Sequence, residues 1–343
     1  MNESKRKNDF FGTLRQDFRE LKEYFLSESQ KSRLEGMSKL KQSLYLTGWL
    51  IKILYQKLTR VRQILLIVGI AALFIGNNSG NSSHLIGGAI LLFIIMLEIK
   101  DKLLARDELL AGRAVQNALL PERSPVIPGW DVWLFTRPAN DVGGDLVDYM
   151  KINENRFGFS LGDVAGKGLA AALFMAKLQA TIRAIAPDYS SLAELAQKIN
   201  RIFCRDGLPN RFASLIYLEL KAGENTVRLI NAGHLPPLPV ENGVIGEMQK
   251  GGPALGLMKN AEYSEKALSL EPGNLLFIYS DGLTEARNEK GEFYGLHYVK
   301  EILSSTNHLS AAEVGEKIVT KVDRFIGDAQ RYDDLSLMVL KRI

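Results

Sequence analysis

Acidic residues adjoin apolar, strand-like runs at widely separated places in this chain. Asp281 and Asp163 each end such a run, and the pair Asp333 and Asp334 comes directly before one. Asp145 follows two consecutive glycines. An acid at the end of a buried strand is held rigidly while its oxygens stay exposed, which suits a hard cation. Because these acids spread over about 190 residues, we expect a metal centre that only a folded domain containing several strands can assemble.

The length and the cysteine content limit the domain organisation and exclude disulfide-rich proteins and cysteine phosphatases. At 343 residues the chain exceeds a usual single domain, so we expect one large domain with an appendage. The single cysteine, Cys204, excludes a disulfide framework and suits a reducing compartment. No arginine pattern of a cysteine-phosphatase loop follows it, so we interpret Cys204 as a small residue that packs within a helix.

Charge is divided unevenly along the chain. Residues 1–113 contain 18 Lys and Arg against 11 Asp and Glu, whereas the remainder contains 25 against 28. A basic N-terminal part is typical of proteins that bind nucleic acid or a membrane surface. Residues 63–97 favour the membrane over nucleic acid, because these 35 residues include no Asp, Glu, Lys or Arg. We therefore expect a membrane partner and no nucleic acid.

Two strongly apolar runs, 64–76 and 85–97, lie within this uncharged segment and are separated by a polar loop. Each is shorter than the roughly 20 residues that span a bilayer. Two helices of about 17 residues within 61–99 nevertheless fit a thin membrane. Basic residues crowd both outer flanks, so the positive-inside rule predicts a multi-pass protein of the cytoplasmic membrane with its C-terminal domain in the cytoplasm. The alternative is a buried helical hairpin in a soluble protein.

Helical segments are expected on both sides of this transmembrane hairpin. Residues 1–60 are interpreted as a cytoplasmic helical segment, part of which lies at the membrane surface. Residues 100–120 carry leucines at helical spacing and end at Pro121, which predicts a linker helix. A helix that leaves the membrane and enters a domain is a candidate dimer stalk that transmits a signal, so we expect a homodimer formed through it. A simple spacer is the alternative.

Residues 121–343 show the pattern of one globular domain. Its strand-like runs span 130–136, 156–161, 213–220, 226–230, 274–279 and 335–340. Its helix-like runs span 168–185, 191–204 and 310–325, the last two opened by serine caps.

The expected metal ligands are acids alone, without His or Cys in the motifs. Oxygen-only coordination selects Mg²⁺ or Mn²⁺ over Zn²⁺. Several acids facing one cleft repel one another unless cations are shared among them, so two ions are expected. Two metals about 3.5–4 Å apart can bridge a water and generate hydroxide for in-line attack on a phosphoryl group. We expect Asp163 to bridge them, because the glycine-rich turn after it lets the backbone approach closely.

Two further motifs leave alternatives open. Residues 162–168 lack the spacing of a P-loop, so their glycines are interpreted as a tight turn that feeds a helix. Lys167 in this turn either is a solvated side chain or attracts phosphate. His234 follows a strand in another turn, where it either acts as a general acid or bonds the backbone of the turn.

Six motifs in this order resemble the PPM (PP2C-like) phosphatases of bacterial stress response and sporulation, the RsbU and SpoIIE group. They lie at 115–121, 141–148, 162–168, 231–234, 279–288 and 333–337. The resemblance covers residues 114–343 and implies an α+β fold, a PP2C-like β-sandwich of two antiparallel sheets flanked by helices. It implies two Mn²⁺ or Mg²⁺ ions and hydrolysis of serine or threonine phosphates. The implied substrate is a phosphorylated STAS-domain anti-anti-sigma factor.

The resemblance also assigns roles to individual residues. Asp163 resembles the bridging ligand, and with Asp281 it is expected to be essential for catalysis. Asp148 resembles a weaker candidate ligand. Leu235 and Ser336 depart from the family pattern without touching a ligand. The implied metal ligands are Asp145, Asp163, the Val164 carbonyl, Asp281 and Asp333, with Asp334 as a substitute for Asp333.

The expected function is therefore a metal-dependent serine/threonine phosphatase anchored to the bacterial cytoplasmic membrane that acts on a phosphorylated regulatory protein. One alternative is a catalytically silent PPM-fold module that captures a signalling partner. Its hallmark would be a missing acidic ligand, and every expected acid is present. A diguanylate cyclase, indicated by Gly143-Gly144-Asp145, is disfavoured because the Glu-Phe expected after that Asp is absent.

Overall fold

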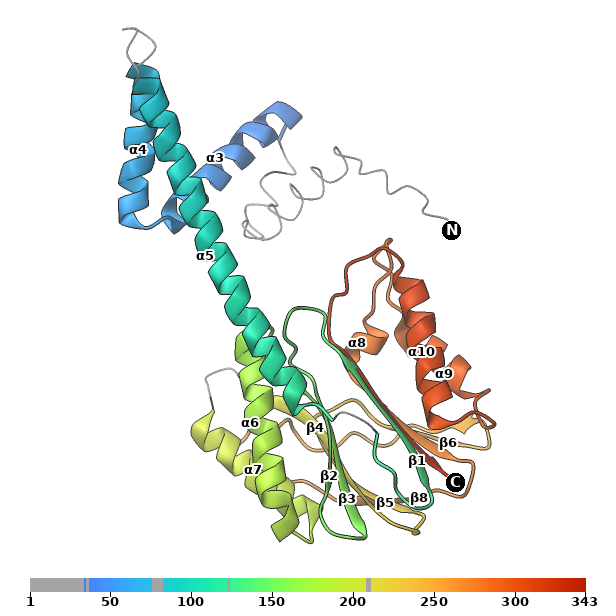
Figure 1. The fold of residues 1–343 in the computed structure, drawn as a ribbon. Helices are drawn as coiled ribbons and strands as arrows, with labels where there is room; N and C mark the ends of the chain where they lie inside the picture. The colour runs from blue at the N-terminus through green and yellow to red at the C-terminus, as the bar shows by residue number, and fades with distance from the viewer. Residues whose placement is uncertain (1–33, 35–36, 76–82, 122–123, 208–210) are drawn as a thin grey trace. The chain divides into compact units, whose positions relative to one another are not determined.

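The computed structural model describes residues 34, 37–75, 83–121, 124–207 and 211–343 (Figure 1). The chain divides into two compact units, Met1–Leu104 and Ala105–Ile343. The boundary lies within one continuous helix, α5 (Ser83–Leu119), which joins the expected second hairpin helix to the expected linker without a break. The helical prediction for residues before 34 lies outside the described residues.

In the N-terminal unit, α4 (Arg60–Ile75) and the first part of α5 pack as a helical hairpin. Gly69 and Gly87 permit this contact, since a Cβ on Gly87 would lie 2.6 Å from the Gly69 carbonyl oxygen. At the base of the hairpin, Arg62 binds Glu98 at 2.5 Å and Asp101 at 2.6 Å. A third helix, α3 (Lys39–Lys57), precedes the hairpin and ends where Leu58 becomes extended.

The hairpin exposes large apolar side chains, with Phe74 78% exposed and Leu92 68% exposed. By length and composition, however, the described helices include one stretch that could cross a membrane, Leu169–Asp188, and it belongs to the C-terminal unit. Because that stretch is 44% buried, it is a core helix of the domain. The α4 helix has only 16 described residues. The multi-pass prediction is not supported by this criterion.

The C-terminal unit is a sandwich of two five-stranded sheets in which every strand pair is antiparallel. One sheet has the order β1 (Trp130–Arg137), β10 (Leu335–Arg342), β9 (Leu275–Tyr279), β6 (Leu238–Glu241) and β7 (Val244–Ile245). The other has the order β2 (Leu146–Lys151), β3 (Arg156–Val164), β4 (Ala213–Lys221), β5 (Thr226–Ala232) and β8 (Lys266–Ser269). The predicted fold of two antiparallel sheets with flanking helices is confirmed.

Helices cover the outer face of each sheet, as Figure 1 shows. The β2–β8 sheet carries α6 (Leu169–Ile185), the 3₁₀ turn Ala186–Asp188 and α7 (Leu192–Asp206). The β1–β7 sheet carries α9 (Gly295–Leu303) and α10 (Ala311–Ile326), while the short α8 (Asp281–Thr284) follows β9. Three apolar clusters result, one under each helical layer and one between the sheets. The C-terminal unit thus consists of four layers, in the order helices, sheet, sheet and helices.

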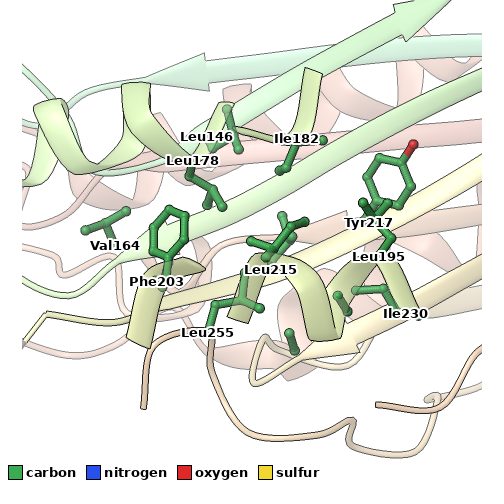
Figure 2. Close-up of a cluster of buried hydrophobic side chains, with 14 of the residues drawn as sticks. Leu146, Val164, Leu178, Ile182, Leu195, Phe203, Leu215, Tyr217, Ile230 and Leu255 are labelled. Carbon is green, nitrogen blue, oxygen red and sulfur yellow. The ribbon is translucent and has the colours of Figure 1, made fainter. Parts of the chain in front are cut away.

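The cluster under α6 and α7 shows why these helices form where they do (Figure 2). Leu178 and Ile182 of α6 lie one turn apart and meet Leu215 of β4, and all three are at most 2% exposed. Phe203 of α7 packs edge-on against Phe174, with ring centroids 4.9 Å apart. Burial of one such side chain contributes roughly 1.5–3 kcal/mol. This packing fixes α6, and with it the glycine-rich turn that precedes α6.

Each strand and helix expected from the sequence of this domain is present, with ends shifted by a few residues. Ser191 caps α7 by accepting the Glu194 N–H, and Ser310 forms a capping box at the start of α10, so both serine caps are confirmed. Six elements were not predicted from the sequence: β2, β6, β7, β8, α8 and α9. These elements are short or interrupted: β6 has four residues and contains Pro239, and β2 contains the buried Asp148.

Candidate metal centre

Strand register brings Asp281, Asp333 and Asp334 together at one end of the β1–β7 sheet. The antiparallel strands β9 and β10 pair with Tyr279 opposite Leu337. Asp281 follows the end of β9 by two residues and the Asp pair precedes β10, so all three acids stand at the same end of the sheet. The backbones of the two segments are in close contact, since a Cβ on Gly282, the residue after Asp281, would lie 1.9 Å from the Asp334 carbonyl oxygen.

Strand register also brings Asp145 and Asp163 together, at one end of the β2–β8 sheet. Leu146, the first residue of β2, pairs with Gly162 of β3, so the two acids flank one strand pair. Gly144 lies against them, because a Cβ there would be 3.6 Å from an Asp163 carboxylate oxygen and 3.2 Å from the Val164 carbonyl oxygen. The backbone carbonyl predicted as a ligand therefore lies beside the loop that carries Asp145.

Asp334 joins the two groups of acids. Its carboxylate accepts hydrogen bonds from the backbone N–H of Gly144 at 2.6 Å and of Ala139 at 2.8 Å, and the side chain is 7% exposed. Gly143 packs directly against this carboxylate, since a Cβ would lie 2.5 Å from Asp334 Oδ2. The loop of one sheet is thus anchored to the strand start of the other, and the acids of both sheets share one region.

Burial, and then repulsion among the acids, raises their pKa values. The pKa of Asp163 is raised to about 7, first by burial and then by the charges of Asp281, Asp333 and Asp334. Burial and the charge of Asp333 also raise the pKa of Asp281. The carboxylates therefore lie near enough to disfavour one another's ionisation, and a bound cation would offset that cost.

Asp145 is the most buried of these acids, at 5% exposed. Burial, followed by the charges of Asp163 and Asp334, raises its pKa well above the usual range. Its Oδ2 has no hydrogen-bond partner among the described residues. A buried carboxylate oxygen without a partner is costly unless a proton or a cation satisfies it, and an all-oxygen donor set fits Mg²⁺ or Mn²⁺.

The acids do not form a closed coordination shell. Within the part of the chain that the structure describes, no three His, Cys, Asp or Glu side chains are already arranged to hold an ion. The donor chemistry and the unpartnered oxygen of Asp145 fit a hard divalent cation, whereas the number of ions and the role of each ligand stay predictions.

Asp333 and Asp334 differ in their surroundings. Asp334 is engaged by backbone N–H groups, whereas the Asp333 side chain is 32% exposed and forms an ion pair with Lys167 at 2.9 Å. Lys167 also donates to the Tyr332 carbonyl at 2.7 Å and lies 4.2 Å from the centre of the Tyr332 ring. Lys167 is therefore half-exposed but held against a candidate ligand, and attraction of phosphate by it stays a prediction. This arrangement favours Asp333 over Asp334 as the ligand.

A cavity of about 560 Å³ opens beside this region and is lined by Asp163 and Asp281 together with Glu285 and Lys250. Both of the acids expected to be essential therefore face a space that can admit a phosphorylated side chain. Glu285 and Lys250 were not identified from the sequence, because an isolated charged residue gives no signal by its spacing.

The His234 ring has a structural role, but its partners are Ser214 and Tyr279 on neighbouring strands and not the backbone of its own turn. Its Nδ1 lies 2.7 Å from the Ser214 hydroxyl and its Nε2 lies 3.1 Å from the Tyr279 carbonyl oxygen. Burial lowers the pKa of His234 to about 4, so the ring is neutral at pH 7. With both nitrogens engaged and the ring 7% exposed, His234 is not placed to donate a proton to a substrate.

Asp148, the weaker candidate ligand, is wrong. Its carboxylate forms a two-pronged ion pair with Arg183 of α6, with N–O distances of 2.8 and 2.6 Å, and its side chain is 4% exposed. The Asp-x-x-Asp spacing on β2 places Asp148 three residues beyond Asp145, and there it fastens α6 to the sheet. This pair occupies both carboxylate oxygens of the buried Asp148, whereas the ion pair of Asp333 with Lys167 uses one oxygen of a partly exposed side chain.

Gln116 is a contact that the sequence analysis did not single out, although it lies in the first of the six motifs. It is 7% exposed on α5, donates from Nε2 to the Gly143 carbonyl at 2.8 Å and accepts the Gly143 N–H at 3.1 Å. The last turns of α5 thus hold the loop that leads to Asp145. In the sequence, the signal that could have identified it is a glutamine close to the end of an amphipathic helix, among the leucines and alanines of that helix.

Comparison with known proteins agrees with this architecture. Residues 153–343 match the sequence model described as Stage II sporulation protein E (SpoIIE). Protein IcfG of Synechocystis sp. is 27% identical over 277 residues, which are 73% of this chain and 43% of IcfG. Phosphoserine phosphatase RsbU of Bacillus subtilis is 24% identical over 239 residues, which are 69% of this chain and 70% of RsbU. The chain therefore spans less than half of IcfG.

The fold itself has solved counterparts. The SiaA-PP2C domain of Pseudomonas aeruginosa has a TM-score of 0.63 and 19% identity, over 71% of this chain and 98% of that domain. Likeness at this identity concerns the fold, and it confirms the PP2C-like sandwich.

Proposed function

This chain belongs to the SpoIIE family, and from that premise we propose that it is a metal-dependent protein phosphatase acting on phosphoserine or phosphothreonine of a regulatory protein. The observation that carries the proposal is the convergence of Asp145, Asp163, Asp281 and Asp333 from two sheets. Burial and, after it, the charges of Asp281, Asp333 and Asp334 raise the pKa of Asp163 to about 7. Strongly perturbed acids beside a cavity are typical of catalytic centres.

Asp145, Asp163, Asp281, Asp333 and the Val164 carbonyl are the groups that would hold two Mg²⁺ or Mn²⁺ ions. Bound metal would supply Lewis acidity toward a phosphoryl oxygen and activate a water for in-line displacement. Asp163 and Asp281 line the cavity and so face an entering phosphoserine.

The remaining polar groups position this set. Asp334 anchors the loop that carries Asp145, and Gln116 holds Gly143 of the same loop, whereas Lys167 is a cation that pairs with Asp333 in place of a metal. The first two contacts tie the loop of one candidate ligand to other elements, so that ligand is oriented before substrate arrives. Orientation of this kind is a large part of catalysis at metal centres.

The proposed substrate is a phosphorylated STAS-type regulatory protein. The family match to a sporulation protein and the name of the relative RsbU, a phosphoserine phosphatase, support this choice. A catalytically silent binding module is less well supported, because all the candidate acids are present and are buried together at an energetic cost.

Membrane anchoring and dimerisation belong to the same proposal. The exposed apolar side chains of α4 and α5, such as Phe74 and Leu92, would lie in lipid, and exposed Leu110 and Val115 further along α5 would pair with a second copy. Through Gln116, rearrangement of α5 would then reach the metal centre. Deletion of residues 1–98 should change basal turnover, and unchanged turnover with an unchanged oligomeric state would contradict this coupling.

The test is phosphate release by the purified full chain in detergent, with Mn²⁺ or with chelator. A phosphoserine peptide, a phosphorylated STAS-domain protein and phosphocasein would serve as substrates. We expect Mn²⁺-dependent turnover that falls more than about 100-fold in Asp163→Asn and Asp281→Asn. Equal turnover of the STAS protein and casein would refute the proposed substrate, and Mn²⁺ binding without turnover on any substrate would favour the silent module.

A further inference from the structure

His234 connects the two sheets at the end of the sandwich that carries the acids. It follows β5 in the β2–β8 sheet, and its Nδ1 lies 2.7 Å from the hydroxyl of Ser214. Ser214 stands on β4 directly opposite Asp163 of β3. On the other side, Nε2 lies 3.1 Å from the carbonyl oxygen of Tyr279, the last residue of β9 and two residues before Asp281. One imidazole therefore connects β4, the strand that pairs with the Asp163 strand, to β9, the strand that leads to Asp281.

The direction of both hydrogen bonds follows from the partners. A carbonyl oxygen only accepts, so Nε2 carries the proton that is donated to Tyr279. In the neutral ring Nδ1 must then accept from the Ser214 hydroxyl. That hydroxyl has a single proton and its other contact, the Asp163 carbonyl oxygen, is longer at 3.4 Å. One tautomer thus satisfies both contacts.

The turn that carries His234 is built to hold the ring in place. Asn231 accepts the His234 N–H at 2.8 Å and donates to the His234 carbonyl at 3.0 Å. Gly233 has φ +72°, and a Cβ there would lie 2.5 Å from the Ala254 nitrogen, so only glycine fits. The backbone and the ring of His234 are therefore held in place without contacts to the acidic side chains. A rigid spacer between the Asp163 and Asp281 segments requires this.

We propose that His234 is a positioning residue that sets the separation of Asp163 and Asp281 across the two sheets, so that both can serve one cation site. The inference rests on the proposed function for its importance in catalysis, but it concerns cation affinity directly. Asp163 and Asp281 belong to different sheets, and no described side chain bonds one carboxylate to the other. The imidazole supplies a connection through Ser214 and Tyr279. Loss of outer contacts of this kind typically costs 10–100-fold in metal affinity.

The test is Mn²⁺ affinity of the full chain in detergent, measured by titration calorimetry, with the thermal midpoint recorded on the same samples. His234→Leu removes both hydrogen bonds, and His234→Gln can keep the donor to Tyr279. Asn200→Leu is the matched control, because Asn200 is also a buried side chain, 1% exposed, that bonds backbone groups of another loop. We expect Mn²⁺ affinity to fall at least 10-fold in His234→Leu, to recover partly in His234→Gln, and to stay at the wild-type value in Asn200→Leu.

Affinity unchanged in His234→Leu, with a thermal midpoint lowered as in Asn200→Leu, would overturn the inference and leave His234 a core residue. If His234→Leu fails to fold, Ser214→Ala removes only the hydroxyl, and we expect at least a 3-fold loss; no loss in that variant would equally overturn it. Asp163→Asn and Asp281→Asn separate this failure from that of the proposed function. If Mn²⁺ binding is insensitive to both, the metal centre itself is wrong, whereas sensitivity there with insensitivity at His234 refutes only the positioning role.

Discussion

Replacing Asp163 by asparagine should stabilise the C-terminal unit without metal and reduce the stabilisation that bound metal provides. The folded-state pKa of Asp163 is about 7, compared with 3.8 for an unperturbed aspartate. Between these two pH values the folded state binds more protons than the unfolded state, so the free energy of unfolding falls as pH rises. The loss begins near pH 4 and is complete above about pH 7. At about 1.4 kcal/mol per pKa unit, its upper bound is on the order of 4 kcal/mol.

In chelator at pH 8, Asp163→Asn should therefore be more stable than the wild type by up to that amount, because the amide carries no charge. At pH 4.5 the two proteins should differ little. With Mn²⁺ at about 100 times its dissociation constant, the wild type should gain roughly 2.7 kcal/mol. The variant should gain much less, because it lacks a ligand.

The assay is urea unfolding followed by circular dichroism at several pH values, with chelator or Mn²⁺. Asp148→Asn is a useful contrast, because it removes an acid that is paired with Arg183 and should destabilise the protein at pH 8. Parallel pH profiles for wild type and Asp163→Asn in chelator would refute the argument that the acids repel one another.

Three further substitutions test the surroundings of the centre. Arg183→Leu leaves the buried Asp148 carboxylate without its partner and should cost about 1–3 kcal/mol in urea unfolding while Mn²⁺ affinity stays unchanged; tighter binding would restore Asp148 as a candidate ligand. Lys167→Met removes the cation that pairs with Asp333 and should tighten Mn²⁺ binding several-fold at low salt. Titration calorimetry should show a smaller difference at high salt, because salt screens the charge of Lys167. Gln116→Leu leaves buried backbone groups of the loop unpaired and should lower Mn²⁺-supported turnover about 10-fold; wild-type turnover would show that α5 does not support the site.

The sequence was informative where one element carries the whole signal. The strand of Asp281 is a continuous apolar run that ends in Asp-Gly, and this pattern identifies both the buried strand and the acid at its end. The capping box at Ser310 is equally local and was predicted. Elements with mixed patterns were missed, such as β8, where exposed and half-buried residues alternate without a strongly apolar face.

Partners that come from distant elements could not be predicted in the same way. Asp148 and Asp145 look alike in the sequence, and only the packing of α6 on β2 places Arg183 against one and not the other. The ion pair of Lys167 with Asp333 joins residues 166 positions apart, and spacing gives no signal for it. The family resemblance identified the acids but did not indicate which of them serve as anchors.

The contact between Gly143 and Asp334 has a consequence for how this sequence can vary among its relatives. The carboxylate fills the space that any side chain at 143 would need, with 2.5 Å between a Cβ there and Oδ2. We therefore expect the two positions, 191 residues apart, to depend on each other, so that a larger residue at 143 accompanies a displaced or shorter side chain at 334. An alignment of family members should show this pair changing together, with Asp334 kept wherever position 143 is glycine.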